Sequence, residues 1–183
     1  MTDTTQSSLS EAIAARAENL YRTRQHLCAD AVLLAFNEGL VGGLTEQQAV
    51  GLTSGLSIGQ GGAGCLCGAV SGGALVLGLF LGGEGRAYRR AGKVREAVAE
   101  LHARFKDAHR TTCCRVLVKA VKDDEAAHFE QCAGLTGDAA RMVAEILFNA
   151  RPELARRADR NRLAIRDSKG RGMLRRAFNR LFR

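Results

Sequence analysis

The chain alternates stretches of helical hydrophobic spacing with glycine-rich breaks. Between residues 13 and 35, apolar residues recur at the spacing of one helix face, and Ser10 just before them has the character of an N-cap. We therefore predict one long first helix that ends among the glycines of residues 37–43. The polar run at residues 45–48 predicts the start of a short second helix that reaches about Leu56.

A glycine-rich break at residues 59–64 precedes an apolar stretch at residues 66–81, which we predict to be a helix. Each glycine inside a helix costs about 1 kcal/mol relative to alanine. The several glycines of this stretch therefore indicate that another backbone or a bound group approaches it closely. Residues 49–83 carry no charge, but only residues 69–81 are strongly apolar, which is too short to span a bilayer. We predict a buried helix pair here.

The second half of the chain predicts further helices. Residues 84–108 are charged and amphipathic, and residues 111–122 form a segment that carries cysteines. We predict a short piece that ends near Cys132, and a separate helix that opens at residues 136–138 and runs through Asn149. No strand pattern appears, so the expected fold class is all-α, a multi-helix bundle.

The net charge of +8 is not spread over the chain. Twelve of the 27 Lys and Arg residues lie in residues 151–183, against three acidic residues, so the rest of the chain is close to neutral. We predict a helical domain at residues 1–150 and an arginine-rich tail at residues 151–183, with Pro152 at the boundary. Residues 173–183 predict a basic amphipathic helix at the C-terminus.

This tail has several interpretations. A basic amphipathic helix can lie on an anionic membrane surface, dock on an acidic protein or bind nucleic acid phosphates. Phe178 and Phe182 on its apolar face favour membrane or protein over nucleic acid, and a solvated extension is the remaining alternative. The polar N-terminus has no signal-peptide pattern, which predicts a cytoplasmic protein. Cysteines there are more often reduced, metal-bound or redox-active than locked in structural disulfides.

Six cysteines are the main candidates for chemistry. Because they fall on four separate segments, they suit a site assembled inside a helical bundle. The spacings match no zinc finger, covalent haem motif, thioredoxin-like motif or ferredoxin run. What remains is binding of an iron–sulfur cluster, Zn or Cu(I) by soft thiolates, reversible disulfide formation, or plain packing as small apolar groups. The six are Cys28, Cys65, Cys67, Cys113, Cys114 and Cys132.

Four blocks of sequence resemble the C_GCAxxG_C_C family of redox-active proteins. They are Cys28-Ala-Asp-Ala-Val, the glycine-rich run into Cys67-Gly-Ala-Val-Ser-Gly, Cys114-Arg-Val-Leu, and Cys132. The resemblance covers about residues 17–147. It implies a helical, redox-active protein, and a related domain fused to split-Soret cytochrome c has a proposed iron–sulfur site. By resemblance, Cys28, Cys67, Cys114 and Cys132 take the family positions, whereas Cys65, Cys113 and the tail are additions.

The leading hypothesis is therefore a redox protein that binds an iron–sulfur cluster for electron transfer or redox sensing. We expect Cys28, Cys67, Cys114 and Cys132 to hold the cluster, and Cys65 and Cys113 to complete the wider set of metal ligands. The chain would then be an oxidoreductase or an electron-transfer component, with a redox partner protein and a homodimeric state as the expected associations. The alternatives are binding or delivery of Cu(I) or Zn, and a scaffold anchored through its basic tail. We expect the histidines on the solvated surface; of the four, His128 is the best placed to serve as an auxiliary ligand, because it lies four residues before Cys132.

Overall fold

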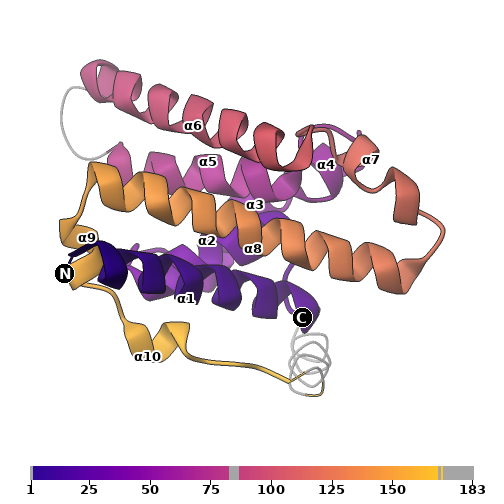
Figure 1. Ribbon diagram of the computed structural model, residues 1–183, viewed down its shortest axis with the longest axis horizontal. Helices are drawn as coiled ribbons and strands as arrows, with labels where there is room; N and C mark the ends of the chain where they lie inside the picture. The colour runs from indigo at the N-terminus through magenta and orange to yellow at the C-terminus, as the bar shows by residue number, and fades with distance from the viewer. Residues whose placement is uncertain (1, 83–86, 169, 171–183) are drawn as a thin grey trace.

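The computed structural model describes residues 2–82, 87–168 and 170, and within these ranges every regular element is helical (Figure 1). The predicted all-α class is confirmed. Long helices form the body: α1 (Thr2–Arg22), α2 (Cys28–Gly39), α5 (Gly68–Leu81), α6 (Ala87–His109) and α8 (Glu125–Ala150). The predicted basic helix at residues 173–183 lies outside the described residues.

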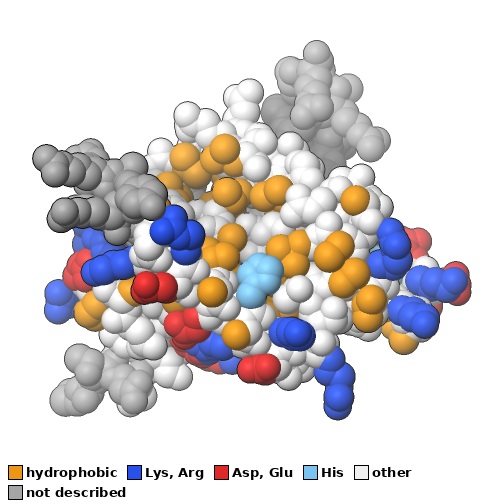
Figure 2. Space-filling view, turned by 90° about the horizontal axis from the view of Figure 1, so that it is seen from above, with side chains coloured by type: hydrophobic (Ala, Val, Ile, Leu, Met, Phe, Trp, Pro, Cys, Tyr) orange, Lys and Arg blue, Asp and Glu red, His pale blue; other side chains and the backbone are white. Residues whose placement is uncertain are grey.

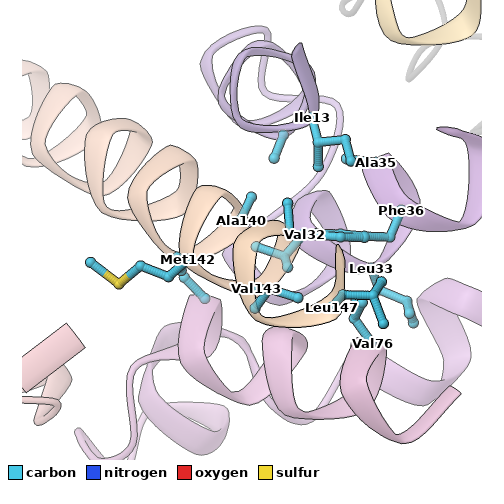
Figure 3. Packing of buried hydrophobic residues seen from close by; sticks show 14 of the residues in the cluster. Ile13, Val32, Leu33, Ala35, Phe36, Val76, Ala140, Met142, Val143 and Leu147 are labelled. Atoms are coloured by element: carbon cyan, nitrogen blue, oxygen red, sulfur yellow. The ribbon is translucent and has the colours of Figure 1, made fainter. Parts of the chain in front are cut away.

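Helix α8 is the centre of the bundle, since it packs against α1, α2, α5 and α6. Its apolar face meets the inward faces of its neighbours in one continuous core (Figure 3). Burial of these side chains away from water is the main force that holds the helices together. Fully or almost fully buried members of this core include Ile13 of α1, Val32 and Phe36 of α2, Val76 of α5, and Val143 and Leu147 of α8.

The predicted single first helix is wrong, because the chain forms two helices in this region. Helix α1 begins at Thr2, well before Ser10, and ends at Arg22. The backbone then turns at Arg24, which has a φ of 57°, and α2 starts at Cys28. The hydrophobic spacing did not reveal the break, because both helices bury their apolar faces in the same core.

Helix α8 shows the opposite difference. We predicted a stop before Gly134 and a new start at residues 136–138, yet the helix is continuous through this region. Packing outweighs the low helix propensity of its glycines. Gly137 faces α1, since a Cβ built on it would lie 3.3 Å from a carboxylate oxygen of Glu18 and 3.6 Å from the Ala14 carbonyl oxygen. The start of α8 is capped by Asp124, whose carboxylate accepts a hydrogen bond from the Ala127 N–H at 3.0 Å.

The region between α2 and α5 follows the prediction more closely. Helix α3 (Glu46–Thr53) starts with a capping box formed by Thr45 and Gln48. The glycine-rich break contains α4 (Ser57–Gly61), a turn that is left-handed at residues 58–61, where every φ is positive. Close approach of another backbone to α5 is confirmed at Gly72, which lies against α2.

The cysteine-bearing segment after α6 forms two short pieces, α7 (Cys114–Leu117) and the 3₁₀ helix η1 (Lys119–Val121). Helices α4 and α7 lie together at one end of the bundle, on the right in Figure 1. The turn from α8 into α9 (Glu153–Arg156) lies at the opposite end. The two cysteine-rich loops, before α5 and before α7, therefore meet at the same end of the molecule.

The first part of the predicted tail docks on the bundle. Leu163 of α10 (Arg160–Leu163) is 1% exposed, and it fills the space above Gly39 of α2. The Arg16 side chain, also buried, is 2.8 Å from the Asp167 carboxylate and 3.2 Å from that of Glu38. This ion-paired arginine ties residues 163–167 to α1 and α2.

No helix within the described ranges is long and apolar enough to cross a membrane.

The face on the α6 side carries apolar side chains near its middle, with acidic and basic groups intermixed around them (Figure 2).

Two histidines depart from the predicted surface position. The His26 side chain is 9% exposed and lies 3.7 Å from the Glu46 carboxylate. The His109 ring packs on that of Phe105, with ring centroids 4.5 Å apart, and lies 3.3 Å from the Asp138 carboxylate.

Candidate functional site

Four of the six cysteines line one small cavity at the α4–α7 end of the bundle. Cys28 begins α2, Cys67 directly precedes α5, Cys114 begins α7, and Cys132 lies within α8. We refer to these four as the inner cysteines. The cavity measures about 20 Å³, which is room for about one water molecule. No described residue that lines it is charged, and the remaining lining residues are Gly68, Ala69, Leu117, Val118, Leu135 and Thr136.

The start of α2 positions the Cys28 side chain. The Leu27 N–H donates to the Asp30 carboxylate at 3.2 Å, and the Ala29 N–H donates to the Ser57 hydroxyl at 3.3 Å. The Ser57 hydroxyl also donates a hydrogen bond to the Cys28 sulfur. These bonds tie the first turn of α2 to the left-handed turn of α4.

The Cys28 sulfur needs a glycine on the neighbouring helix. A Cβ built on Gly68 would lie 2.4 Å from the Cys28 Sγ and 3.0 Å from the Leu56 carbonyl oxygen. Real Cβ atoms do not approach other heavy atoms this closely, so a side chain at position 68 would displace the sulfur. Position 68 therefore points directly at the inner cysteines.

The inner cysteines also interact electrostatically. A charge on the Cys28 sulfur would interact with Cys67, with Cys114 and with Cys132, and a charge on the Cys114 sulfur would likewise interact with Cys67 and Cys132. The inner cysteines thus form one interacting set.

Burial controls the ionisation of these thiols. It raises the pKa of Cys67 to about 12 and that of Cys132 to about 11. Burial likewise raises the pKa of Cys28 and that of Cys114, with the nearby sulfurs adding to the effect at Cys114. At neutral pH the inner cysteines are therefore thiols and not thiolates.

Tyr21 of α1 is a site residue that the sequence analysis missed. Its hydroxyl donates a hydrogen bond to the Cys132 sulfur, which lowers the pKa of Cys132 against the larger effect of burial. Its ring packs on Phe129, with ring centroids 4.9 Å apart. Burial raises the pKa of the Tyr21 hydroxyl, so it stays a donor. Nothing in the spacing of Tyr21 linked it to Cys132, because only the packing of α1 on α8 joins them.

Cys65 and Cys113 are not among the residues that line the cavity, and we refer to them as the outer pair. Cys65 is exposed and Cys113 is half-buried, and their thiols are hydrogen-bonded to each other. This hydrogen bond is the main cause that raises the pKa of Cys65. The pKa of Cys113 is lowered, first by the Val116 N–H and also by the Cys65 thiol. The structure therefore divides the six predicted ligands into the four inner cysteines and the outer pair. His128, the predicted auxiliary ligand, is not among the residues that line the cavity.

The inner cysteines match an iron–sulfur cluster in donor type and number, since four soft thiolates hold such clusters. The available space does not match. The cavity holds about one water molecule. Among the described residues, no three His, Cys, Asp or Glu side chains stand close enough together to hold a metal ion. A cluster does not fit between the inner cysteines as they are arranged.

These features define an all-helical protein with a small cavity lined by four thiols and a second thiol pair that includes the exposed Cys65. The chain belongs to the family described as "Putative redox-active protein (C_GCAxxG_C_C)", whose sequence pattern matches residues 26–146. Comparisons with curated proteins and with solved structures found no match.

The chain departs from the order of residues in the family's name. The name gives glycine, cysteine and alanine in that order, whereas this chain has Cys67, Gly68 and Ala69. Position 68 points at Cys28, so a cysteine there would meet the Cys28 sulfur directly. Here Cys67 supplies the thiol from the preceding position, and Gly68 leaves the space that the Cys28 sulfur fills.

Proposed function

We propose that this chain is a redox protein whose working groups are the inner cysteines, and that these act by reversible disulfide formation. The observation that carries the proposal is their convergence, because four separate segments, three helices and the residue directly before α5, each contribute one thiol to the same cavity. When two of these thiols join, they lose two electrons and two protons. A disulfide in a redox partner protein accepts both and becomes two thiols.

Cys28 is the sulfur that we expect in this disulfide. It interacts with each of the other inner cysteines, as Cys114 also does, and its sulfur is in addition held by a hydrogen bond from the Ser57 hydroxyl. Burial keeps these sulfurs in the thiol form at neutral pH, and the thiolate is the reactive form. We therefore expect the inner thiols to react slowly with dissolved oxidants and faster by thiol–disulfide exchange with a redox partner protein.

A second candidate is a thiolate-bound metal, favoured by the softness and number of the four donors. An iron–sulfur cluster is the first form of this candidate, and Cu(I) or Zn are the alternatives. In each case Cys28, Cys67, Cys114 and Cys132 would be the ligands, and the cavity would have to widen for a cluster. A homodimer, a cytoplasmic location and contacts of the tail with an anionic membrane or an acidic protein stay predictions.

The test is metal and thiol analysis of the full chain purified without oxygen. Iron, sulfide, copper and zinc are measured together with a visible spectrum. The free thiols are then counted in denaturant before and after treatment with a dithiol-specific oxidant such as diamide. A metal-free protein that forms a reversible disulfide at Cys28 is the expected result. Stoichiometric metal would instead establish the second candidate.

Two variants make this test specific. Cys28→Ser should abolish the inner disulfide, whereas the matched variant Cys65→Ser, outside the cavity, should retain it on treatment with diamide. Inner thiols that stay reduced with diamide, in a protein without metal, would contradict both candidates.

A further inference from the structure

The outer pair lies where two loops are held together. Cys65 is in the loop between α4 and α5, and Cys113 is in the loop between α6 and α7. The Arg115 N–H donates to the Gly64 carbonyl at 2.9 Å, and the Cys67 N–H donates to the Thr112 carbonyl at 2.8 Å. These bonds lie on either side of the outer pair, so the loops hold the two cysteines next to each other.

The thiols of the outer pair are in direct contact. The Cys65 and Cys113 side chains are hydrogen-bonded to each other, and the Cys113 thiol lies 3.2 Å from the Gly64 carbonyl oxygen, to which it can donate. The Arg115 guanidinium crosses the same loop, where it donates to the Ala63 carbonyl at 2.7 Å. It also covers Gly64, since a Cβ built there would lie 2.8 Å from the Arg115 Nε. The fixed loops, the contact and the positive charge suit attack on an external, anionic disulfide.

Exposure distinguishes Cys65 from the other cysteines. Cys65 is exposed, Cys67 two residues later is 5% exposed, and the remaining four cysteines are half-buried. A disulfide-bearing molecule can therefore reach Cys65, and through it the outer pair, without any movement of the core. Cys65 and Cys113 are additions to the cysteine positions of the family, so the family pattern does not explain why they form a pair.

Cys114 connects the two groups. It follows Cys113 directly and lines the inner cavity, and it interacts with Cys65 and Cys113 as well as with Cys28. Among the described residues, neither Cys65 nor Cys113 is one of the main electrostatic partners of Cys28, Cys67 or Cys132. A sulfur at this place can receive a disulfide bond from the outer pair and pass it to Cys28.

We propose that the outer pair, Cys65 and Cys113, is a surface dithiol through which the inner cysteines exchange with an external disulfide, with Cys114 as the link. The surface dithiol is independent of the proposed function, whereas the transfer to the inner cysteines rests on it. The class of partner is a small or protein-borne disulfide, with oxidised glutathione as the probe.

The chemistry balances in two stages. Cys113 attacks one sulfur of the external disulfide and releases one thiol. Cys65 then attacks the Cys113 sulfur, which forms the Cys65–Cys113 bond and releases the second thiol. In the second stage Cys114 attacks Cys65 and frees Cys113, and Cys28 attacks Cys114 and frees Cys65. The net result is a Cys28–Cys114 disulfide, a reduced outer pair and two molecules of external thiol, with each proton passed to the leaving sulfur.

The experiment follows the reaction of the reduced full chain with oxidised glutathione over time. Samples are quenched with acid, the remaining thiols are alkylated, and the linked peptides are fragmented in a mass spectrometer. Fragmentation is needed because no Lys or Arg lies between Arg24 and Arg86, so Cys28, Cys65 and Cys67 share one tryptic peptide. The Cys65–Cys113 disulfide should appear first and the Cys28–Cys114 disulfide later.

Variants separate the steps. Cys65→Ser should stop at glutathione attached to Cys113, with the inner thiols reduced. Cys114→Ser should form the Cys65–Cys113 disulfide and go no further. Ser54→Ala, at an exposed residue outside both groups of cysteines, is the control and should form both disulfides. Unchanged thermal unfolding of each variant checks that the fold is intact.

Two results would overturn the proposal in different ways. If the inner disulfide forms in Cys65→Ser at the wild-type rate, the outer pair does not take part in the transfer, whereas the proposed function of the inner cysteines is unaffected. A persistent Cys65–Cys113 disulfide, with inner thiols that resist diamide as well, would remove both the transfer and the proposed function. A Cys113–Cys114 disulfide, or a dimer linked through Cys65, in place of the Cys65–Cys113 bond would also overturn the proposal.

Discussion

Gly72 of α5 lies directly against the backbone of Ala29 in α2. A Cβ built on Gly72 would be 2.6 Å from the Ala29 carbonyl oxygen and 2.9 Å from its Cα. Because both neighbours are backbone atoms, neither can turn aside as a side chain could. This contact sets the separation of two helices: α2, which begins at Cys28, and α5, which Cys67 directly precedes.

Gly72→Ala should therefore push α2 and α5 apart. The expected loss is about 1–3 kcal/mol in the free energy of unfolding, the usual cost of overpacking. Gly78→Ala in the same helix is the control, since nothing lies within 4 Å of a Cβ at that position. It should stabilise the protein by about 0.5–1 kcal/mol, because alanine is the better helix former. Urea unfolding measures both, and equal stabilities for the two variants would contradict this account.

Stability should fall with pH in the alkaline range. Folding raises the pKa of Cys67 to about 12 and that of Cys132 to about 11, from about 8.5 in an unfolded chain. Above about pH 8.5 the unfolded state loses protons that the folded state keeps, so the contribution of these thiols to stability declines up to about pH 11–12. Below about pH 8.5 both states are protonated, and these groups add no pH dependence.

Urea unfolding under reducing conditions at about pH 8 and about pH 10 tests this decline. Cys67→Ala should show a smaller loss of stability between the two values than the wild type. Cys65→Ala lacks only an exposed thiol and serves as the control for the general effect of alkaline pH. Equal losses of stability in Cys67→Ala and the wild type would show that ionisation of Cys67 does not cause the decline.

Tyr21→Phe should change the reactivity of Cys132 with little effect on the fold. The substitution keeps the ring that packs on Phe129 but removes the hydrogen bond to the Cys132 sulfur. The pKa of Cys132 should rise further, and its alkylation by iodoacetamide at about pH 9 should slow. Loss of one hydrogen bond should cost about 0.5–1.5 kcal/mol.

Mass spectrometry can follow this reaction, because the tryptic peptide of residues 123–141 contains no other cysteine. Alkylation of the exposed Cys65 in the same sample is the internal reference. Faster alkylation of Cys132 in the variant would mean that the Tyr21 hydroxyl protects the sulfur instead of stabilising its thiolate.

Arg16→Ala should release the segment around Asp167. The Arg16 side chain is 5% exposed and pairs with both Glu38 and Asp167, so its removal takes away the ion pairs that it makes with these two carboxylates. A loss of about 1.5–3 kcal/mol is expected, as for hydrogen bonds to charged groups. Faster amide hydrogen exchange at residues 163–167 would locate the effect.

Arg22→Ala is the matched control for this prediction. Arg22 pairs with Glu18 and Glu130, but its side chain is 39% exposed, so the loss should stay within about 1 kcal/mol. Similar losses for the two arginine variants would show that burial of the Arg16 pairs is not what stabilises the docked segment.

Much of the fold and part of the site could be predicted from the sequence. Helical spacing identified the bundle, and the resemblance selected Cys28, Cys67, Cys114 and Cys132, which the structure brings to one cavity. The helix ends were harder, because the periodicity runs across the turn at Arg24 and because packing on α1 carries α8 through Gly137.

The division of the cysteines could not be predicted. Cys113 and Cys114 are adjacent in sequence, yet one belongs to the outer pair and the other lines the cavity. Their directions depend on where α7 begins and on the hydrogen bonds between its loop and residues 64–67, which are long-range contacts. Sequence adjacency carries no information about either.

The distribution of the inner cysteines over α2, α5, α7 and α8 has a consequence for protein synthesis. The cavity does not exist until α8 has left the ribosome and docked on α1. Until then, the cysteines of the emerging chain have the pKa and reactivity of ordinary thiols, because the burial that protects them has not formed. Oxidants present during translation can therefore join the wrong partners, and correct maturation depends on keeping the nascent thiols reduced until the last of these helices is in place.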